Sequence, residues 1–349
     1  MPTDLSPSGF ADLAESIARE ASSLAARRRA EGVEVADRKS SIVDVVTAAD
    51  REVEALIRAR IAEARPDDAF FGEESGTGAG SSGITWVVDP IDGTVNYLYG
   101  SAEYGVSIGV VRGPADPAAW EPVAGVVVAP ATGVVHRAVA GEGATRDGAP
   151  LRVGAPASLA ETLVATGFGY TADRRRQQVA VLAGLIGEVR DIRRGGAASL
   201  DCCAVGAGTV DAYYERGINP WDMAAGSIVA QEAGAVVRIW DAGAPGRSCS
   251  PARPSSTNWA RCCSVSRSPC SESEPARPSV CPSVWGSRAV VRRTGDTVWV
   301  LLPFWGPVIC SLPTSASRPD QDHPERMPTP PSRPCTPTAP RTRPHRSST

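Results

Sequence analysis

The chain has 349 residues, 42% of them hydrophobic, which is enough for one large domain or two ordinary ones. It has no apolar run of about 18 residues and no basic start followed by an apolar stretch, so we predict neither a membrane span nor a secretory signal, and we expect a cytoplasmic protein. The net charge of −3 hides an asymmetry, because residues 1–241 carry 22 basic and 33 acidic side chains and residues 242–349 carry 14 and 6.

The first part of the chain predicts two helices followed by antiparallel strands. Apolar residues recur with helical spacing over 11–30 and 47–64, and Thr47 with Asp50 forms a capping-box pattern at the start of the second helix. Residues 130–133, Pro-Ala-Thr-Gly, are typical of a hairpin turn. The predicted strands are 68–72, 84–88, 104–112, 122–129 and 134–140.

After about residue 150, strands and helices alternate. The predicted strands are 162–166, 189–193, 210–214 and 235–240, and the predicted helices are 172–188, 197–208 and 221–233. Such alternation favours an α/β arrangement. We therefore divide this part of the chain into an N-terminal α+β half, residues 1–150, and a C-terminal α/β half, residues 151–241.

Residues 242–349 differ in composition from the rest. They hold 19 of the 30 prolines and seven of the nine cysteines, and they lack hydrophobic periodicity. Regular C-x-x-C pairs with histidine partners are missing, so we predict no zinc site. We expect a low-complexity tail that is either disordered or translated out of frame, because a GC-rich gene read in the wrong frame yields such a mixture of Arg, Pro, Ser and Cys.

Acidic residues recur where predicted strands end or predicted helices begin. They are Asp44 in DVVTAAD, Glu73 in FFGEESG, Asp89 and Asp92 in WVVDPIDGT, and Asp222 in PWDMAAG. Each motif alone is more often a solvated turn, a strand exit or a helix cap, and only their joint occurrence favours a site. Gathered carboxylates repel one another at neutral pH unless some are protonated or a cation offsets their charge. Oxygen ligands without His or Cys suit Mg²⁺ or Mn²⁺.

The DPIDGT stretch combines two kinds of site. We predict that Pro90 fixes a turn, so that Asp89 and Asp92 point to one side with the Ile91 carbonyl between them. Gly93 permits a ligand to approach the backbone closely, and Gly93-Thr94 open a helix whose free N–H groups favour a phosphate. A metal-binding turn next to an anion-binding helix start suits a phosphate ester.

Catalysis through a Ser-His-Asp triad is not predicted. His136 is the only histidine in the first 241 residues, and we place it on the surface of its strand. Cys202 and Cys203 lie in an alanine-rich helix, where we expect them to pack as small hydrophobic residues.

The ordered set of motifs resembles the inositol monophosphatase family of Mg²⁺-dependent, Li⁺-sensitive sugar-phosphate phosphatases, in particular its bacterial inositol-1-phosphatase-like members. The matching segments lie between about residues 10 and 240: DVVTAAD, GEES, WVVDPIDGTVN and GGAASLDCCAVGAGTVDAYYERGINPWDMAAG. The resemblance implies a layered αβαβα sugar-phosphatase fold, with an antiparallel N-terminal half and an α/β C-terminal half. It also implies a homodimer.

The resemblance further implies roles for individual residues. Two or three Mg²⁺ ions, with Mn²⁺ as the alternative, would be held by Glu73, Asp89, the Ile91 carbonyl, Asp92 and Asp222. Thr94 and the Gly93–Thr94 backbone would meet the phosphate, while Asp44 would bond Thr94 and help it and Glu73 to orient the attacking water. The polyol would contact Gly196, Ala197, Ala198, Glu215 and Asp222. The family often has a hydroxyl residue where this chain has Ala197.

The expected reaction is hydrolysis of myo-inositol monophosphate to inositol and phosphate. Histidinol-phosphate and fructose-1,6-bisphosphate phosphatases share the metal motifs and stay open as alternatives. Arg174, Arg175 and Arg176 could meet a second phosphate, although such a run is more often the solvated face of a helix. A hypothesis of another class is an inactive or moonlighting binding protein that touches nucleic acid through its basic tail. That tail lacks interleaved aromatic residues and any nucleic-acid module, so we do not expect this partner.

The out-of-frame origin of residues 242–349 is testable on the coding DNA alone. One of the other two reading frames downstream of codon 240 should encode a glycine turn, a short apolar strand and an amphipathic helix within about 30 residues, because a sheet of this kind needs a covered edge. If neither frame encodes these elements, the segment is the natural C-terminal sequence.

Overall fold

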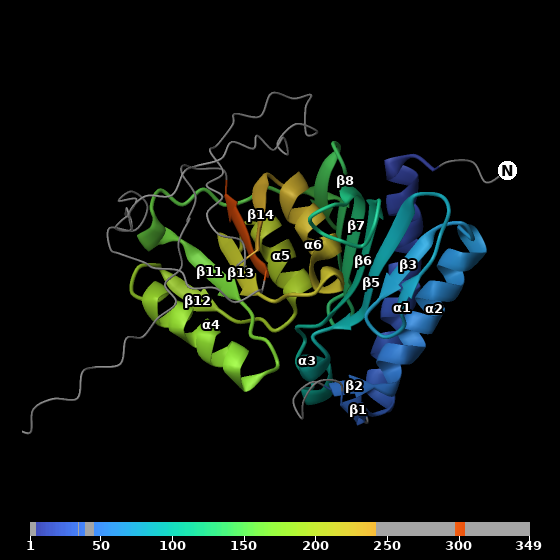
Figure 1. Ribbon diagram of the computed structural model, residues 1–349, viewed down its shortest axis with the longest axis horizontal. Coiled ribbons are helices and arrows are strands. Elements are labelled where there is room, and N and C mark those ends of the chain that lie inside the picture. The colour runs from blue at the N-terminus through green and yellow to red at the C-terminus, as the bar shows by residue number, and fades with distance from the viewer. Residues whose placement is uncertain (1–4, 34, 39–44, 242–296, 304–349) are drawn as a thin grey trace, which may run out of the picture. The chain divides into compact units, whose positions relative to one another are not determined.

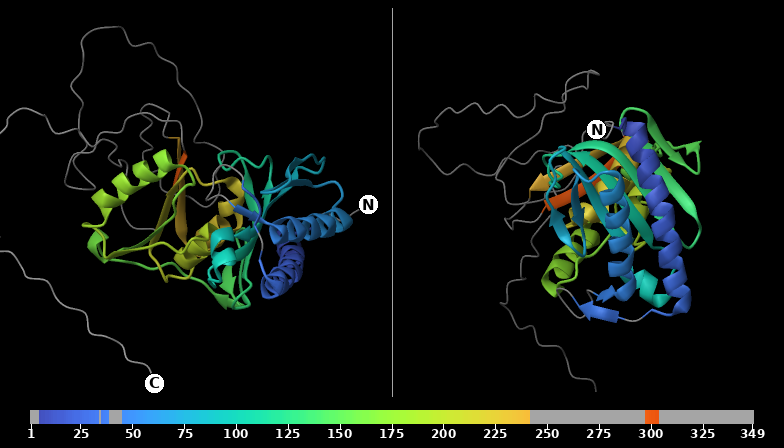
Figure 2. Two further views of the ribbon diagram at one scale, coloured as in Figure 1. Left: turned by 90° about the horizontal axis from the view of Figure 1, so that it is seen from below. Right: turned by 90° about the vertical axis from the view of Figure 1, so that its right-hand side faces the viewer.

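The computed structural model of the chain describes residues 5–33, 35–38, 45–241 and 297–303. One compact unit, Met1–Ser315, contains all of them. Within it, helices and two large sheets alternate in the order helix, sheet, helix, sheet, helix, as Figure 1 shows across its width and the left view of Figure 2 shows from below. The predicted αβαβα layering is confirmed.

Two long helices form the first layer. α1 spans Pro7–Glu31 and α2 spans Ala48–Ala64, and both pack on one face of the first sheet. α1 begins earlier than predicted because the Ser6 side chain accepts a hydrogen bond from the Gly9 N–H group at 3.1 Å, with Pro7 at the first helical position. The predicted capping box of α2 is confirmed. Among the described residues, no helix is long and apolar enough to cross a membrane.

The second layer is an eight-stranded sheet in the order β10-β9-β8-β7-β6-β5-β3-β4. Its neighbouring strands are antiparallel except for the parallel pair β3–β5, so the prediction of an antiparallel N-terminal half holds with that one exception. The strands are β3 (Ala69–Gly72), β4 (Gly76–Gly78), β5 (Ile84–Asp92), β6 (Gly105–Arg112), β7 (Glu121–Ala129), β8 (Val134–Val139), β9 (Gly143–Arg146) and β10 (Ala149–Pro150). A separate hairpin of β1 (Val35–Arg38) and β2 (Val45–Thr47) was not predicted.

Helices α5 (Ala198–Gly206) and α6 (Pro220–Glu232) form the middle layer. α6 lies directly on the first sheet because two strand glycines leave room for its backbone. A Cβ atom on Gly109 would lie 2.7 Å from Ala224 Cβ, and one on Gly125 would lie 2.7 Å from the Ala225 carbonyl oxygen. This close approach holds the first turn of α6 near the end of β5. Cys202 and Cys203 of α5 are buried, as predicted.

The fourth layer is a five-stranded sheet in the order β12-β11-β13-β15-β14. β11 pairs in parallel with β12 and β13, whereas β15 pairs antiparallel with β13 and β14. Helix α4 (Ala172–Leu185) covers the outer face, where Val181 and Leu185 pack against Val164 and Tyr214. The strands are β11 (Leu163–Thr166), β12 (Asp191–Arg193), β13 (Ala212–Arg216), β14 (Ala235–Asp241) and β15 (Thr297–Pro303). Two short helices, α3 (Thr94–Tyr99) and the 3₁₀ turn η1 (Leu159–Glu161), complete the fold.

The boundary at residue 150 falls between the last strand of the first sheet and the first strand of the second. As a division into domains it stays a prediction. Residues 297–303 of the C-terminal segment form β15, and the rest of 242–349 lies outside the described residues. The expectation of a disordered or out-of-frame tail therefore also stays a prediction.

His136 does not lie on the surface, so its predicted placement is wrong. Only 7% of the residue is exposed. Residues two apart in a strand face the same side, and Ala138 belongs to the apolar cluster that includes Ile228 and Val229 of α6. The middle helix layer therefore covers the His136 face of β8. Burial, together with the positive charge of Arg146, lowers the pKa of His136 to about 4.

This burial predicts a pH dependence of stability. The pKa of His136 is about 4 in the folded chain and near 6.5 without the fold, so the unfolded state binds the proton first as the pH falls. The stabilisation from His136 is therefore complete above about pH 6.5 and is lost toward about pH 4. In urea titrations from about pH 7.5 to 4.5, the wild type should lose about 2 kcal/mol more than His136→Gln. Equal losses would show that the folded chain protonates His136 freely.

Candidate metal and substrate site

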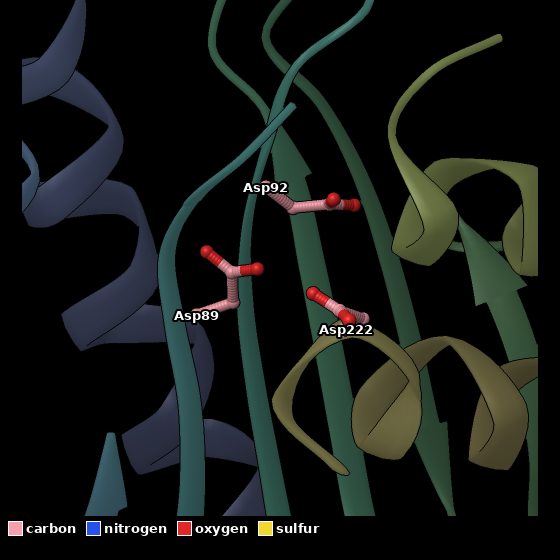
Figure 3. A group of neighbouring side chains, drawn as sticks. All are labelled: Asp89, Asp92 and Asp222. Atoms are coloured by element: carbon pink, nitrogen blue, oxygen red, sulfur yellow. The ribbon is translucent and has the colours of Figure 1, made fainter. Parts of the chain in front are cut away.

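The site begins with an irregularity in β5. The strand continues through Asp92, so the predicted turn at Pro90 is wrong. In a regular strand, residues three apart face opposite sides. Here Asp89 pairs with Ser107 and Asp92 with Gly105, so β5 has one residue more than β6 over this stretch. Pro90 has no N–H group to donate, which favours such a bulge, and the extra residue turns both carboxylates to one side, as Figure 3 shows.

Three carboxylates meet beside this bulge. Asp89 and Asp92 are buried, and Asp222 projects from the first turn of α6. Each offers an oxygen atom that lies within 4.8 Å of the other two (Figure 3). Burial raises the pKa of all three groups. The charge of Glu73 raises the pKa of Asp89 further, and the charge of Asp92 does the same for Asp222.

This cluster fits a hard divalent cation. Three buried or half-buried carboxylates at this separation repel one another, and a bound cation offsets that charge. The donors are oxygen atoms only, which Mg²⁺ and Mn²⁺ prefer. Of the predicted ligands, the structure gathers Asp89, Asp92 and Asp222, with Glu73 close enough to Asp89 to influence its pKa. The Ile91 carbonyl oxygen accepts a hydrogen bond from the Thr94 hydroxyl at 3.1 Å.

Asp92 also holds the start of α5. The N-cap residue of this helix, Ala197, has no side chain that can accept a hydrogen bond. Instead the Asp92 carboxylate accepts from the Ala198 N–H group at 3.2 Å, from the Ser199 N–H group at 2.7 Å and from the Ser199 hydroxyl at 2.5 Å. These bonds satisfy amide groups that a helix start leaves unpaired. A predicted metal ligand thus fixes the segment that was predicted to line the polyol.

The predicted phosphate and polyol segments lie against each other. Gly93 has a φ of +86°, which favours glycine, and a Cβ atom there would lie 3.1 Å from Ala197 Cβ and 3.2 Å from the Gly196 carbonyl oxygen. The Asn96 side-chain amide donates to the Gly195 carbonyl at 2.9 Å and to the Glu103 carbonyl at 2.6 Å. Asn96 therefore links α3 to Gly195, which directly precedes the residues predicted to contact the polyol.

The hydroxyl of Thr94 has a carboxylate partner. It lies 3.2 Å from Asp50 Oδ1, and burial raises the pKa of Asp50 to about 6. Asp44, the predicted partner of Thr94, lies outside the described residues, so its role stays a prediction.

Glu215 lies on β13 and is half-buried. Its carboxylate accepts a hydrogen bond from the Tyr213 hydroxyl. A Cβ atom on Gly167 would lie 1.9 Å from Glu215 Oε2, so a glycine is needed for the carboxylate to lie there. Burial raises the pKa of Glu215, against the lowering effects of Tyr213, Arg194 and Arg174. A carboxylate held in this way can accept hydrogen bonds from hydroxyl groups.

The sequence analysis missed three residues at this site: Asp50 as partner of Thr94, Asn96 and Ser199. The sequence indicated only that Asp50 takes part in the capping box of the second helix. It did not indicate that the other oxygen of this carboxylate accepts a hydrogen bond from Thr94. The NYLY and SLDC segments contain Asn96 and Ser199, but their contacts join positions about 100 residues apart. No local pattern could have found them.

Comparison with known proteins agrees with this geometry. The model of the inositol monophosphatase family matches residues 7–267. The chain is 42% identical over 254 residues to a Mycobacterium tuberculosis inositol-1-monophosphatase SuhB, covering 68% of this chain and 86% of that protein. It is 39% identical over 203 residues to a Pasteurella multocida protein named Nus factor SuhB, covering 57% and 73%. The solved structure of Mycobacterium tuberculosis SuhB matches with a TM-score of 0.59 at 41% identity, covering 68% of this chain and 89% of that one.

An αβαβα fold whose sheet and helix ends bring carboxylates together defines a class of phosphatases that generally depend on metal ions. The chain belongs to the inositol monophosphatase family and is therefore a phosphatase enzyme acting on small phosphate compounds.

Cation binding at the cluster predicts a change in thermal stability. About 10 mM MgCl₂ should raise the melting temperature of the wild type by roughly 5 °C, because a cation that binds only the folded state stabilises it. Asp222→Asn should show little of this shift, since it loses one of the three converging carboxylates. Differential scanning fluorimetry measures both, with NaCl of matched ionic strength as control. Equal Mg²⁺ shifts in the two proteins would exclude Asp222 as a ligand.

Proposed function

We propose that the chain hydrolyses a phosphate monoester of a polyol, myo-inositol monophosphate, with Mg²⁺, or Mn²⁺ as the alternative, held by Asp89, Asp92 and Asp222. The observation that carries this proposal is the meeting of these carboxylates beside Gly93–Thr94, which lies against Gly196–Ala197. Glu73 and the Ile91 carbonyl complete the ligand set by family resemblance. Cations held there supply charge that neutralises the phosphate and lowers the pKa of a water molecule.

In this proposal, different residues orient the attacking water and bind the phosphate. The Thr94 hydroxyl can donate to Asp50 or to the Ile91 carbonyl, which leaves its lone pairs to orient the attacking water. By family resemblance Glu73 helps to orient that water, and the Gly93–Thr94 amides meet the phosphate oxygens. Because phosphoryl transfer needs chiefly positioning and charge stabilisation, no further nucleophile is required.

In this proposal the polyol binds between two groups of residues. Gly196, Ala197 and Ala198 offer backbone groups on one side, and Glu215 accepts hydrogen bonds from polyol hydroxyls on the other. Asp222 borders both the cations and the substrate. Because Ala197 has no hydroxyl group, Gly196, Ala197 and Ala198 contact the polyol through backbone groups alone.

The arginine run of α4 favours a monophosphate over a bisphosphate such as fructose-1,6-bisphosphate. Arg174 donates to the Gly217 carbonyl at 3.2 Å, and Arg175 donates to the Gly169 carbonyl at 2.8 Å. Arg176 pairs with Asp173. These side chains are engaged within the chain, which disfavours their use for a second phosphate.

A binding role without catalysis is the second candidate, because two relatives, from Pasteurella multocida and Vibrio cholerae, are named Nus factor SuhB. The gathered carboxylates favour catalysis, since an anion-binding or nucleic-acid-binding surface has no use for them. A homodimer and inhibition by Li⁺, which the family resemblance implies, stay predictions, and so does the cytoplasmic location expected from the sequence.

Phosphate release tests the proposal directly. With Mg²⁺ present, the wild type should release phosphate from myo-inositol 1-phosphate faster than from histidinol phosphate or fructose 1,6-bisphosphate. Asp92→Asn should fall below about a tenth of the wild-type rate, because loss of charge stabilisation costs several kcal/mol. It should also melt earlier, since an amide cannot accept all three bonds from the start of α5. Asp191→Asn, a change at an exposed residue of β12, serves as control. No release from any of the three would refute the proposal.

Glu215→Gln should change substrate preference more than catalysis. The expected loss in kcat/KM is larger for inositol phosphate than for a small aryl phosphate that has no polyol hydroxyls, because a charged acceptor binds a hydroxyl more strongly than an amide does. Glu188→Gln changes an exposed glutamate of the same half and should affect neither substrate. Equal losses for both substrates would place Glu215 in the structural framework or near the cations instead.

A further inference from the structure

Glu54 lies on α2, one turn after Asp50, and only 3% of it is exposed. Its carboxylate is directed at the turn between β3 and β4. Oε2 accepts a hydrogen bond from the Glu74 N–H group at 2.8 Å, and Oε1 accepts one from the Ser75 N–H group at 2.8 Å. Each oxygen therefore holds one amide, and the two bonds together fix the direction of the turn.

The same turn carries Glu73, the acid next to Asp89. The Glu73 N–H group donates to the Val88 carbonyl at 3.2 Å, in continuation of the parallel pairing of β3 with β5. Three successive amides, those of residues 73, 74 and 75, are thus held by β5 and by Glu54. The backbone that directs the Glu73 side chain is constrained on both sides.

Gly72 shows how closely the Glu54 carboxylate approaches this backbone. A Cβ atom on Gly72 would lie 2.4 Å from Glu54 Oε2 and 2.6 Å from its Cδ. A side chain at position 72 would therefore displace the carboxylate. The sequence places a glycine directly before the predicted ligand, and the space it leaves is filled by Glu54.

We propose that Glu54 is a positioning residue for the cation site, which sets the position of Glu73 through the Glu74 and Ser75 amides. The inference rests on the proposed metal role of Glu73. A carboxylate accepts at both oxygens, whereas a glutamine side chain has one acceptor and one NH₂ donor, so Glu54→Gln leaves one amide facing a donor. Loss of such a supporting contact typically weakens metal affinity by about tenfold or more.

The test is calorimetric titration of Mg²⁺ into substrate-free protein. The wild type and Glu52→Gln should bind equally, and Glu54→Gln should bind about tenfold more weakly. Glu52 is the matched control, because it lies on the same helix but is exposed and pairs with Arg28. In assays, Glu54→Gln should need about tenfold more Mg²⁺ for half-maximal rate, with an unchanged KM for substrate at saturating Mg²⁺.

The outcomes separate this inference from the proposed function. If the wild type itself does not bind Mg²⁺, the proposed cation site fails and the inference with it. If the wild type binds Mg²⁺ and Glu54→Gln binds it equally well, only the role of Glu54 fails, even where the variant melts earlier. Should Glu54→Gln not fold, hydrogen exchange on the metal-free wild type decides. Protected Glu74 and Ser75 amides support the role of Glu54, and rapid exchange at both overturns it.

Discussion

The hydrogen bonds from α5 to Asp92 are the contacts on which the arrangement of the site depends. They join the bulged end of β5 to the first turn of a helix that is more than 100 residues further along the chain. Because Asp92 is buried and its pKa is raised, its negative charge is costly unless donors or a cation surround it. The α5 donors supply part of that compensation, and one oxygen of the same carboxylate lies within 4.8 Å of an oxygen of Asp89 and of Asp222. The start of α5 and the carboxylate cluster are therefore parts of one electrostatic arrangement.

Glycines make this arrangement sterically feasible. At Gly109 and Gly125 they let α6 approach the first sheet, and at Gly93 they let the start of α3 lie against Gly196. An added Cβ atom would lie 2.7 Å from α6 at Gly109 and at Gly125, which is too close, and at Gly93 the φ of +86° disfavours a residue with a side chain. The site is consequently positioned by backbone packing between layers as well as by polar contacts.

The sequence was sufficient to predict the longer elements of the fold but not the short strands β1, β2, β4, β9 and β10, since the helical spacing in α1 and α2 and the turn between β7 and β8 are local signals. All predicted helices and strands up to residue 241 are present, with ends that agree within four residues. Local patterns failed where a tertiary contact decides. Pro90 was read as a turn former, but pairing with β6 keeps β5 extended through Asp92. His136 was placed at the surface because a strand alone does not reveal that α6 covers it. The contacts of Asp50, Asn96 and Ser199 were invisible for the same reason, whereas the acids Asp89, Asp92 and Asp222 were found because each stands at the end of a recognisable element.

The position of β15 affects the order in which the protein can be made. β13, which carries Glu215, pairs with β11 on one side and with β15 on the other, and β14 also pairs with β15. A ribosome adds about 5 to 20 residues per second, so the interval between synthesis of Arg216 and of Pro303 is on the order of ten seconds. During that interval β13 and β14 each have an unpaired edge, which another nascent chain can join. The second sheet is thus completed only late in translation. The strands of the first sheet, in contrast, all lie within residues 69–150. Protection by chaperones during that interval therefore matters more for the second sheet than for the first.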